Sequence, residues 1–194
     1  VATGKLEPIG AVKDIQMPLG GIADKILVQE GDRVSAGQAL ILLDTESTRK
    51  ELEALQESIR LKKEQLELKE IELNRYLQMN SEEAKMLGSN LALDKEILER
   101  FKILSEEGAS AELQYLQQRN KVGEMEGRLM QTKVDRFRQS AILEGQLKQL
   151  RAELTDLQAR ITNTGVTLKY QTLRAPVDGV VFDLKPKSPG YAAR

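Results

Sequence analysis

Hydrophobic residues recur along the chain with two different periods, and the changes of period divide it into three segments. Up to about residue 47, short apolar runs alternate with glycines, as is typical of short β-strands joined by turns. From about 48 to 163 the spacing is helical, and no proline interrupts it. After residue 164 proline and glycine return. The predicted order is therefore strand-rich, helical, strand-rich.

Apolar residues in the helical segment recur at the spacing of a coiled-coil seam. They are Leu52, Ile59, Leu66 and Leu73 at sevens, then Leu143, Leu147, Leu150, Leu154, Leu157 and Ile161 at alternating fours and threes. Between these runs the same spacing continues in a different phase, through Met130, Val134, Phe137 and Ala141. We therefore expect the seam to shift near Ser140, as a stutter in a heptad pattern would produce.

The sequence around Gly108 predicts a reversal of the helical chain. Residues 107–110 (Glu-Gly-Ala-Ser) combine a glycine suited to ending one helix with a serine suited to capping the next. A reversal here gives an outgoing arm at 48–106 and a returning arm at 111–163, which can pair antiparallel over about 80 Å. A second, weaker break is predicted at 80–90, which contains Gly88 and few apolar seam positions.

Composition excludes several classes of function. The chain has 194 residues, with 29 Lys and Arg against 30 Asp and Glu, so it lacks the excess of cations that a nucleic-acid-binding protein needs. Cysteine and histidine are absent, which removes thiolate and imidazole metal ligands, thiol nucleophiles and histidine bases. No run of 18 apolar residues occurs. We expect no enzyme activity, no metal and no cofactor.

The two strand-rich ends resemble each other. The runs Met17–Ile22 and Ala175–Val180 share the pattern small or apolar, Pro, x, x, Gly, β-branched, and Ile26 and Leu184 follow four residues later. A hairpin would also bring the two ends together. We therefore predict one small β domain made of two similar halves, with the helical hairpin inserted between them.

At this point the sequence resembles a known family. The run from Gly21 to Asp44 looks like the first half of a biotinyl/lipoyl domain, and the run from Ala175 to Val181 looks like the second half as found in membrane fusion proteins, with the opening residues 2–5 similar to the hemolysin D branch. The matching structural positions are Pro18, Gly21, Gly31, Asp32, Gly37, Pro176 and Gly179.

The resemblance implies an α+β fold in which a long antiparallel coiled-coil hairpin is inserted into a split lipoyl domain. Its first half with an N-terminal extension would be residues 1–47, the hairpin 48–163, and a truncated second half 164–194. It also implies a tip motif at the turn, where Arg100, Leu104 and the Gly108-Ala109-Ser110 segment would engage an outer-membrane duct. The alternative for the tip is a solvent-exposed turn with a capping serine and a seam leucine.

The function implied by the resemblance is that of a periplasmic adaptor in type I secretion. Its partners would be an inner-membrane ABC transporter, a TolC-like outer-membrane channel contacted through the tip, and further copies of itself, six in the assembled pump. An N-terminal inner-membrane anchor would lie outside this sequence. The alternatives are a multidrug or lipid efflux adaptor of the same architecture and a coiled-coil scaffold without a transport role.

Two catalytic interpretations are less well supported by the residues. A lipoyl domain could carry a modified lysine, but the position after the Leu43-Asp44-Thr45 strand end is Ser47, and a helical arm departs there. The many Glu and Lys residues of the arms could suggest acid and base catalysis. Solvated helix faces with ion pairs four residues apart explain them better. The turn glycines are not followed by Lys-Ser/Thr or by a helix start, so they do not form a phosphate loop.

Overall fold

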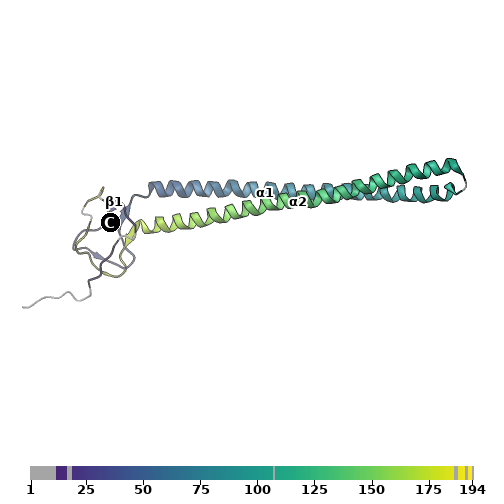
Figure 1. Ribbon diagram of the computed structural model, residues 1–194. Coiled ribbons are helices and arrows are strands. Elements are labelled where there is room, and N and C mark those ends of the chain that lie inside the picture. The colour runs from purple at the N-terminus through teal and green to yellow at the C-terminus, as the bar shows by residue number, and fades with distance from the viewer. Residues whose placement is uncertain (1–11, 17–18, 107, 186–187, 191, 194) are drawn as a thin grey trace, which may run out of the picture. The chain divides into compact units, whose positions relative to one another are not determined.

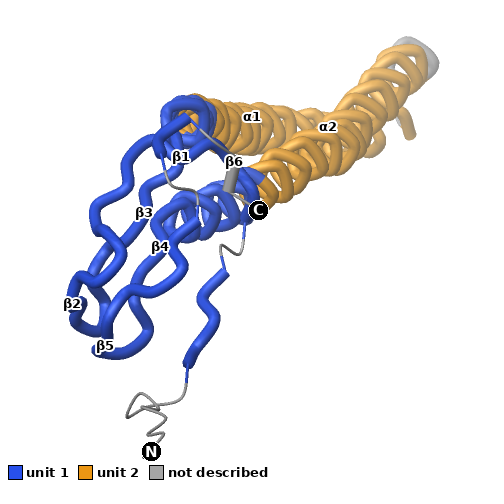
Figure 2. Tube along the Cα trace, turned by 90° about the vertical axis from the view of Figure 1, so that its left-hand side faces the viewer, with its two compact units in different colours: residues 1–59, 157–194 blue, residues 60–156 orange. Residues whose placement is uncertain are grey.

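The structure, a computed structural model, describes residues 12–16, 19–106, 108–185, 188–190 and 192–193. Its elements confirm the predicted order of strands, helices and strands (Figure 1). In chain order they are β1 (Gly21–Ile26), β2 (Arg33–Val34), β3 (Ala39–Leu43), α1 (Glu46–Ser105), α2 (Ala109–Tyr170), β4 (Thr172–Arg174), β5 (Gly179–Val180) and β6 (Ala192–Ala193). The chain divides into two compact units, residues 1–59 with 157–194 and residues 60–156, which Figure 2 colours separately.

In the first unit, strands from before the helices pair with strands from after them. The larger sheet has the order β4-β3-β1-β6, and all its pairings are antiparallel. The two inner strands, β3 and β1, precede the helices, and each pairs with an outer strand that follows them. A second, two-stranded sheet joins β2 to β5, with Arg33 opposite Val180. The small core contains Ala23, Val28, Leu40, Ile41 and Ala175, drawn from both ends of the chain. The expectation that the two ends form one β unit is confirmed.

Turn residues of the first half bind the backbone of the second half. Gly31 and Gly37 have φ values of 95° and 84°, which favour glycine, and their N–H groups donate to the carbonyls of Val181 and Ala175. The Asp178 carboxylate accepts a hydrogen bond from the Ala36 N–H at 2.6 Å. These bonds join residues more than a hundred positions apart. They hold the two halves together independently of the sheet.

The remaining motif positions have local structural roles. The Asp32 carboxylate accepts from the Gln29 N–H and closes a turn, and Gly179 begins β5. Gly21 begins β1, where a Cβ atom would lie 2.9 Å from Leu43 Cδ1. Pro176 is exposed beside buried Ala175. Pro18 lies outside the described residues.

The start of α1 is fixed by a carboxylate cap. Asp44 Oδ1 accepts a hydrogen bond from the Glu46 N–H at 2.9 Å, and the first helical bond runs from Arg49 N–H to the Thr45 carbonyl. Ser47 therefore lies in the first turn of the helix, where a carrier domain would need an exposed hairpin turn.

The predicted break at 80–90 is wrong, because α1 continues without interruption from Glu46 to Ser105. The weak apolar pattern there has another cause: Asn80 occupies a buried position and hydrogen-bonds across to α2. Gly88 costs about 1 kcal/mol relative to alanine in a helix, which packing by neighbouring side chains can offset. The returning helix also ends later than the predicted residue 163, at Tyr170, because the buried face continues through Thr164.

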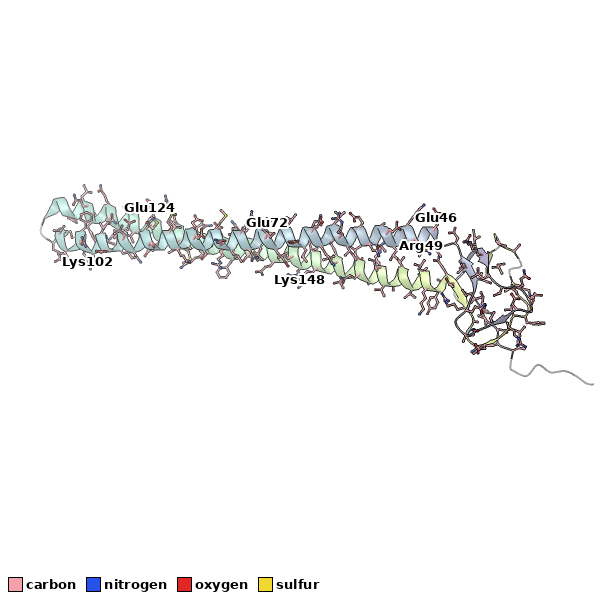
Figure 3. All side chains as sticks on the ribbon, turned by 180° about the vertical axis from the view of Figure 1, so that it is seen from behind. Glu46, Arg49, Glu72, Lys102, Glu124 and Lys148 are labelled. Atoms are coloured by element: carbon pink, nitrogen blue, oxygen red, sulfur yellow. The ribbon has the colours of Figure 1, made fainter. Side chains whose placement is uncertain are left out.

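The buried face of α1 extends the predicted period of seven. It continues from Leu73 through Asn80, Leu87, Asp94 and Phe101, all buried or half-buried. On α2, the six predicted positions from Leu143 to Ile161 are likewise buried or half-buried. Charged side chains, Glu124 and Lys148 among them, stand out from the helices along their length (Figure 3). The two helices therefore pair through the predicted seam.

The four apolar residues of different phase do not belong to that seam. Met130, Val134, Phe137 and Ala141 are exposed, and Phe137 retains 77% of its accessible surface. The buried face of this stretch is formed instead by Leu129, Thr132, Asp135 and Gln139. Spacing alone identifies a helical face but not the face that meets the partner. The shift near Ser140 is nevertheless present, since Asp135, Gln139, Leu143 and Leu147 are each four residues apart.

We expect Leu147→Ala to lower the free energy of unfolding by about 2–4 kcal/mol, because Leu147 is only 4% exposed and its removal leaves a cavity. Phe137→Ala is the matched control and should change it by less than about 0.5 kcal/mol, since the ring is exposed. Urea denaturation followed by circular dichroism measures both. Equal losses for the two variants would contradict the assignment of the buried face.

Candidate partner-docking site at the helical turn

The chain reverses between Ser105, the last residue of α1, and Ala109, the first of α2. Contacts across the two helices show that they run antiparallel in one register. Asn80 bonds to Thr132, and Asp94 bonds to Gln118, so fourteen residues along α1 are matched by fourteen along α2 in the opposite direction. The predicted reversal near Gly108 is confirmed (Figure 1). Of the predicted turn at 107–110, Glu107 lies outside the described residues.

Arg100 and Leu104 lie one helical turn apart near the end of α1. The Arg100 guanidinium is exposed and forms an ion pair with Glu96 at 2.6 Å, and Leu104 is 46% exposed. Gly108 lies in open space, since an added Cβ would meet no atom within 4 Å. Ala109 and Ser110 belong to the first turn of α2, and their side chains are not among those that the structure describes. The structure thus places Arg100 and Leu104 together on the surface.

Other exposed apolar residues at this end were missed by the sequence reasoning. Ile103 is 64% exposed and Leu113 is 61% exposed, and Leu116 is partly exposed. They fall outside the positions that pack between the helices, which include Phe101, Ser105 and Tyr115. The signal that could have found them is an apolar residue out of phase with the seam. Together with Leu104 they make the end of the hairpin more apolar than a simple solvated turn requires.

A buried carboxylate joins the two helices three turns from the reversal. Asp94 is 5% exposed, and Gln118 Nε2 donates to its carbonyl at 2.9 Å and to Oδ1 at 3.1 Å, while Lys121 Nζ lies 2.7 Å from the same Oδ1. The hydrogen bond from Lys121, followed by that from Gln118, lowers the pKa of Asp94 below its ordinary value of 3.8. This cluster fixes the register of the two helices next to the candidate site.

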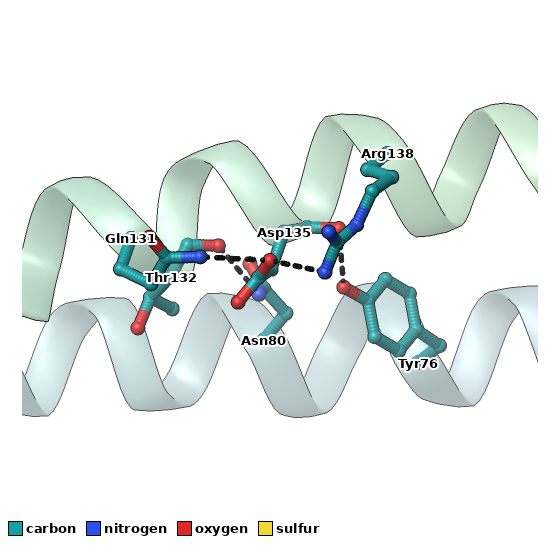
Figure 4. A network of polar contacts seen from close by, with 6 residues as sticks. All are labelled: Tyr76, Asn80, Gln131, Thr132, Asp135 and Arg138. Carbon is teal, nitrogen blue, oxygen red and sulfur yellow. Dashed lines mark hydrogen bonds and ion pairs between the residues drawn. The ribbon is translucent and has the colours of Figure 1, made fainter.

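A second polar cluster joins the helices farther from the turn (Figure 4). The Tyr76 hydroxyl donates to the Asp135 carbonyl at 2.8 Å, and Asn80 Nδ2 donates to the Thr132 carbonyl at 2.9 Å. The Asp135 carboxylate also binds Arg138 and Gln131 on its own helix. Two side chains of α1 therefore bond to backbone carbonyls of α2, just before and at the first residue of the stretch where the sequence suggested a break.

The described residues at the turn provide a surface for contact with another protein. No group of three or more metal-ligating side chains gathers in the part of the chain that the structure describes. Neither α1 nor α2, as far as they are described, has an apolar stretch of the length and hydropathy needed to cross a membrane. The candidate site is an exposed turn with a cation and apolar side chains, and such a surface can bind another protein by helix packing.

We expect the structure to lose stability on acidification below pH 3.8 through Asp94. Because the folded state lowers the pKa of this carboxyl, its contribution is complete above the unfolded value and disappears as the pH falls through the lower folded value. The Asp94→Asn variant should be less stable than the wild type at pH 7, and this difference should shrink at pH 2–3, where the carboxyl of the wild type becomes protonated. Thermal unfolding at both pH values measures it, and a difference that stays constant would contradict the role of the charged form.

Comparisons with known proteins identify the fold. No protein-family model matches the chain, and no curated protein matches it significantly in sequence. Among solved structures it is similar to the periplasmic adaptor protein EmrA, with a TM-score of 0.53 and 18% identity, over 92% of this chain and 70% of that one. A similarity to the soluble domain of LipC, a membrane fusion protein of a type I secretion system, has a TM-score of 0.49 and 15% identity, over 93% of this chain and 94% of that one. The chain has the fold of the periplasmic adaptor protein EmrA.

Proposed function

We propose that this protein is a membrane fusion protein of the hemolysin D type, a periplasmic adaptor that links an inner-membrane ABC exporter to a TolC-like outer-membrane duct in type I secretion. The observation that carries the proposal is the combination of two features in one chain. Its two ends form a single β unit, and the helices between them reverse at Gly108 with an EmrA-like fold. Such a protein acts by connecting partners and catalyses no reaction.

The β unit corresponds in this proposal to a lipoyl domain that packs against copies of itself. Support comes from the glycine turns at 31 and 37, whose backbone bonds join the first half to the second. Ser47 in the first turn of α1 leaves no place for a modified lysine, which separates this unit from lipoyl carriers. We propose a ring of copies, six in the assembled pump, held at the inner membrane by an anchor outside this sequence.

The helical turn is the proposed contact with the outer-membrane duct. Arg100 can offer a charge-assisted hydrogen bond, and Leu104 one turn later can enter a groove between helices on the same approach. Ile103 and Leu113 widen the apolar surface. The ion pair with Glu96 is exposed on both sides and therefore weak, so Arg100 can exchange it for a contact with the duct.

We expect Arg100→Asp and Leu104→Asp each to weaken binding to the duct about 30-fold or more, the effect of losing a central contact in an interface. Secretion of cargo into the medium, measured in cells carrying each variant in the full-length protein, should fall accordingly. Both residues are exposed, so the circular dichroism spectrum and melting temperature should remain those of the wild type.

The matched control is Lys63→Asp, a charge reversal on an exposed residue of the same helix at a distance from the turn. It should leave secretion unchanged. If both tip variants secrete normally while the control does too, the docking role of the turn is refuted.

A further inference from the structure

A second heptad seam runs along α2 on the surface. Its nine positions alternate by threes and fours, and all of them are exposed. They are Leu113, Leu116, Asn120, Gly123, Gly127, Met130, Val134, Phe137 and Ala141. We call these residues the outer seam of α2. Five large apolar side chains at this spacing, with Phe137 at 77% exposure, form a surface of the kind that packs against a helix.

The outer seam faces away from α1. The residues that pack against α1 are interleaved with it in sequence, and Gln118, Val122 and Thr132 are buried there. In the middle of the outer seam, Gly123 and Gly127 lie one helical turn apart, and a Cβ added at either would meet no atom within 4 Å. A partner helix could therefore approach closely at this level, with its large side chains filling the space above the glycines.

A matching stripe runs along α1. Leu61, Leu68, Met79, Met86 and Leu93 are all exposed, at intervals of seven, eleven, seven and seven residues. The buried face of α1 includes Tyr76, Asn80 and Ala84, each four residues apart, and the interval of eleven spans this irregularity, so the stripe keeps a constant position beside the buried face. We call these residues the flank of α1. Part of the flank, Leu68 and Met79, lines a groove of about 440 Å³ with Tyr76 and Leu143.

We propose that the outer seam of α2 packs against the flank of α1 of a second copy of this chain, standing alongside in the same direction. The cross-helix bonds give the levels: Met79 lies about level with Thr132, and Leu93 about level with Gln118. Two unshifted copies then bring Met86 over the Gly123–Gly127 space and Met79 beside Met130 and Val134. This rests on the proposed function in that it supplies the contact between neighbours in the ring.

Charges beside the two stripes are of opposite sign at the same level. Glu82 and Glu83 flank Met79 and Met86 on α1, and Lys133 lies between Met130 and Phe137 on α2. All three are exposed, and neither Glu83 nor Lys133 forms an ion pair with another described residue. A heterologous contact of this kind repeats from copy to copy and closes a ring when the rotation allows it. The same charges disfavour packing of two outer seams against each other, which would bring the two Lys133 residues close.

The experiment mixes two single-cysteine proteins, Met86→Cys and Gly127→Cys, under mild oxidation. The chain contains no cysteine of its own, so each protein has one thiol, and a mixed disulfide can form only between chains. We expect a covalent heterodimer on a non-reducing gel, with the 86–127 link identified by peptide mass spectrometry. Its yield should exceed by at least tenfold that of the control mixture, Lys85→Cys with Gly127→Cys, because Lys85 is exposed at the same level but rotated by about 100° from Met86 around α1.

Equal yields in the two mixtures would overturn the proposal, as would a predominance of 127–127 homodimers, which would indicate pairing of two outer seams. A second variant tests the contact itself: Phe137→Glu in the Gly127→Cys protein should reduce the heterodimer at least fivefold while the melting temperature stays unchanged. Failure of the proposed function gives a different result, with the 86–127 link formed but cargo not secreted. Normal secretion without the link would refute only this contact.

Discussion

The fixed register between α1 and α2 is the constraint on which the rest of the helical unit depends. A purely apolar seam could slide by one heptad at little cost, but this seam contains Asn80 and Asp94 at buried positions. A slide of seven residues would place Asp94 near Met125 instead of Gln118 and leave a buried carboxylate without its donors. The register in turn determines that the reversal falls at Gly108 and which side chains the turn exposes.

Much of the fold could be predicted because its signals are local. The heptads from Leu143 to Ile161, the glycine turns and the Gly108 reversal each depend on neighbouring residues. The errors arose where the deciding contact is distant in sequence. The stretch beginning at Asn80 was interpreted as a helix break because the partner of Asn80, the Thr132 carbonyl, is 52 residues away in the sequence. Backbone carbonyls have no sequence signature, so such a bond cannot be anticipated from residue types.

The candidate site was predictable to a similar extent. That Arg100 and Leu104 share one face follows from a spacing of four residues in a helix, and the structure places them so. Ile103 and Leu113 were missed because an isolated apolar residue is indistinguishable from ordinary surface until the packed face is known. The Asp94 to Lys121 ion pair, 27 residues apart, likewise required the register before it could be recognised.

The misread phase of Met130 to Ala141 carries a general consequence for α2. A helix with one seam facing its partner and another facing outward has apolar residues on opposite sides, so its amphipathic character largely cancels and the sequence appears evenly mixed. Natural surfaces rarely keep such a stripe without use, because exposed heptads invite association. In this chain the flank of α1 provides a counterpart, a second exposed apolar stripe at the level of the outer seam. Two exposed apolar stripes at the same level, with charges of opposite sign beside them, are better explained by packing against each other than by chance exposure.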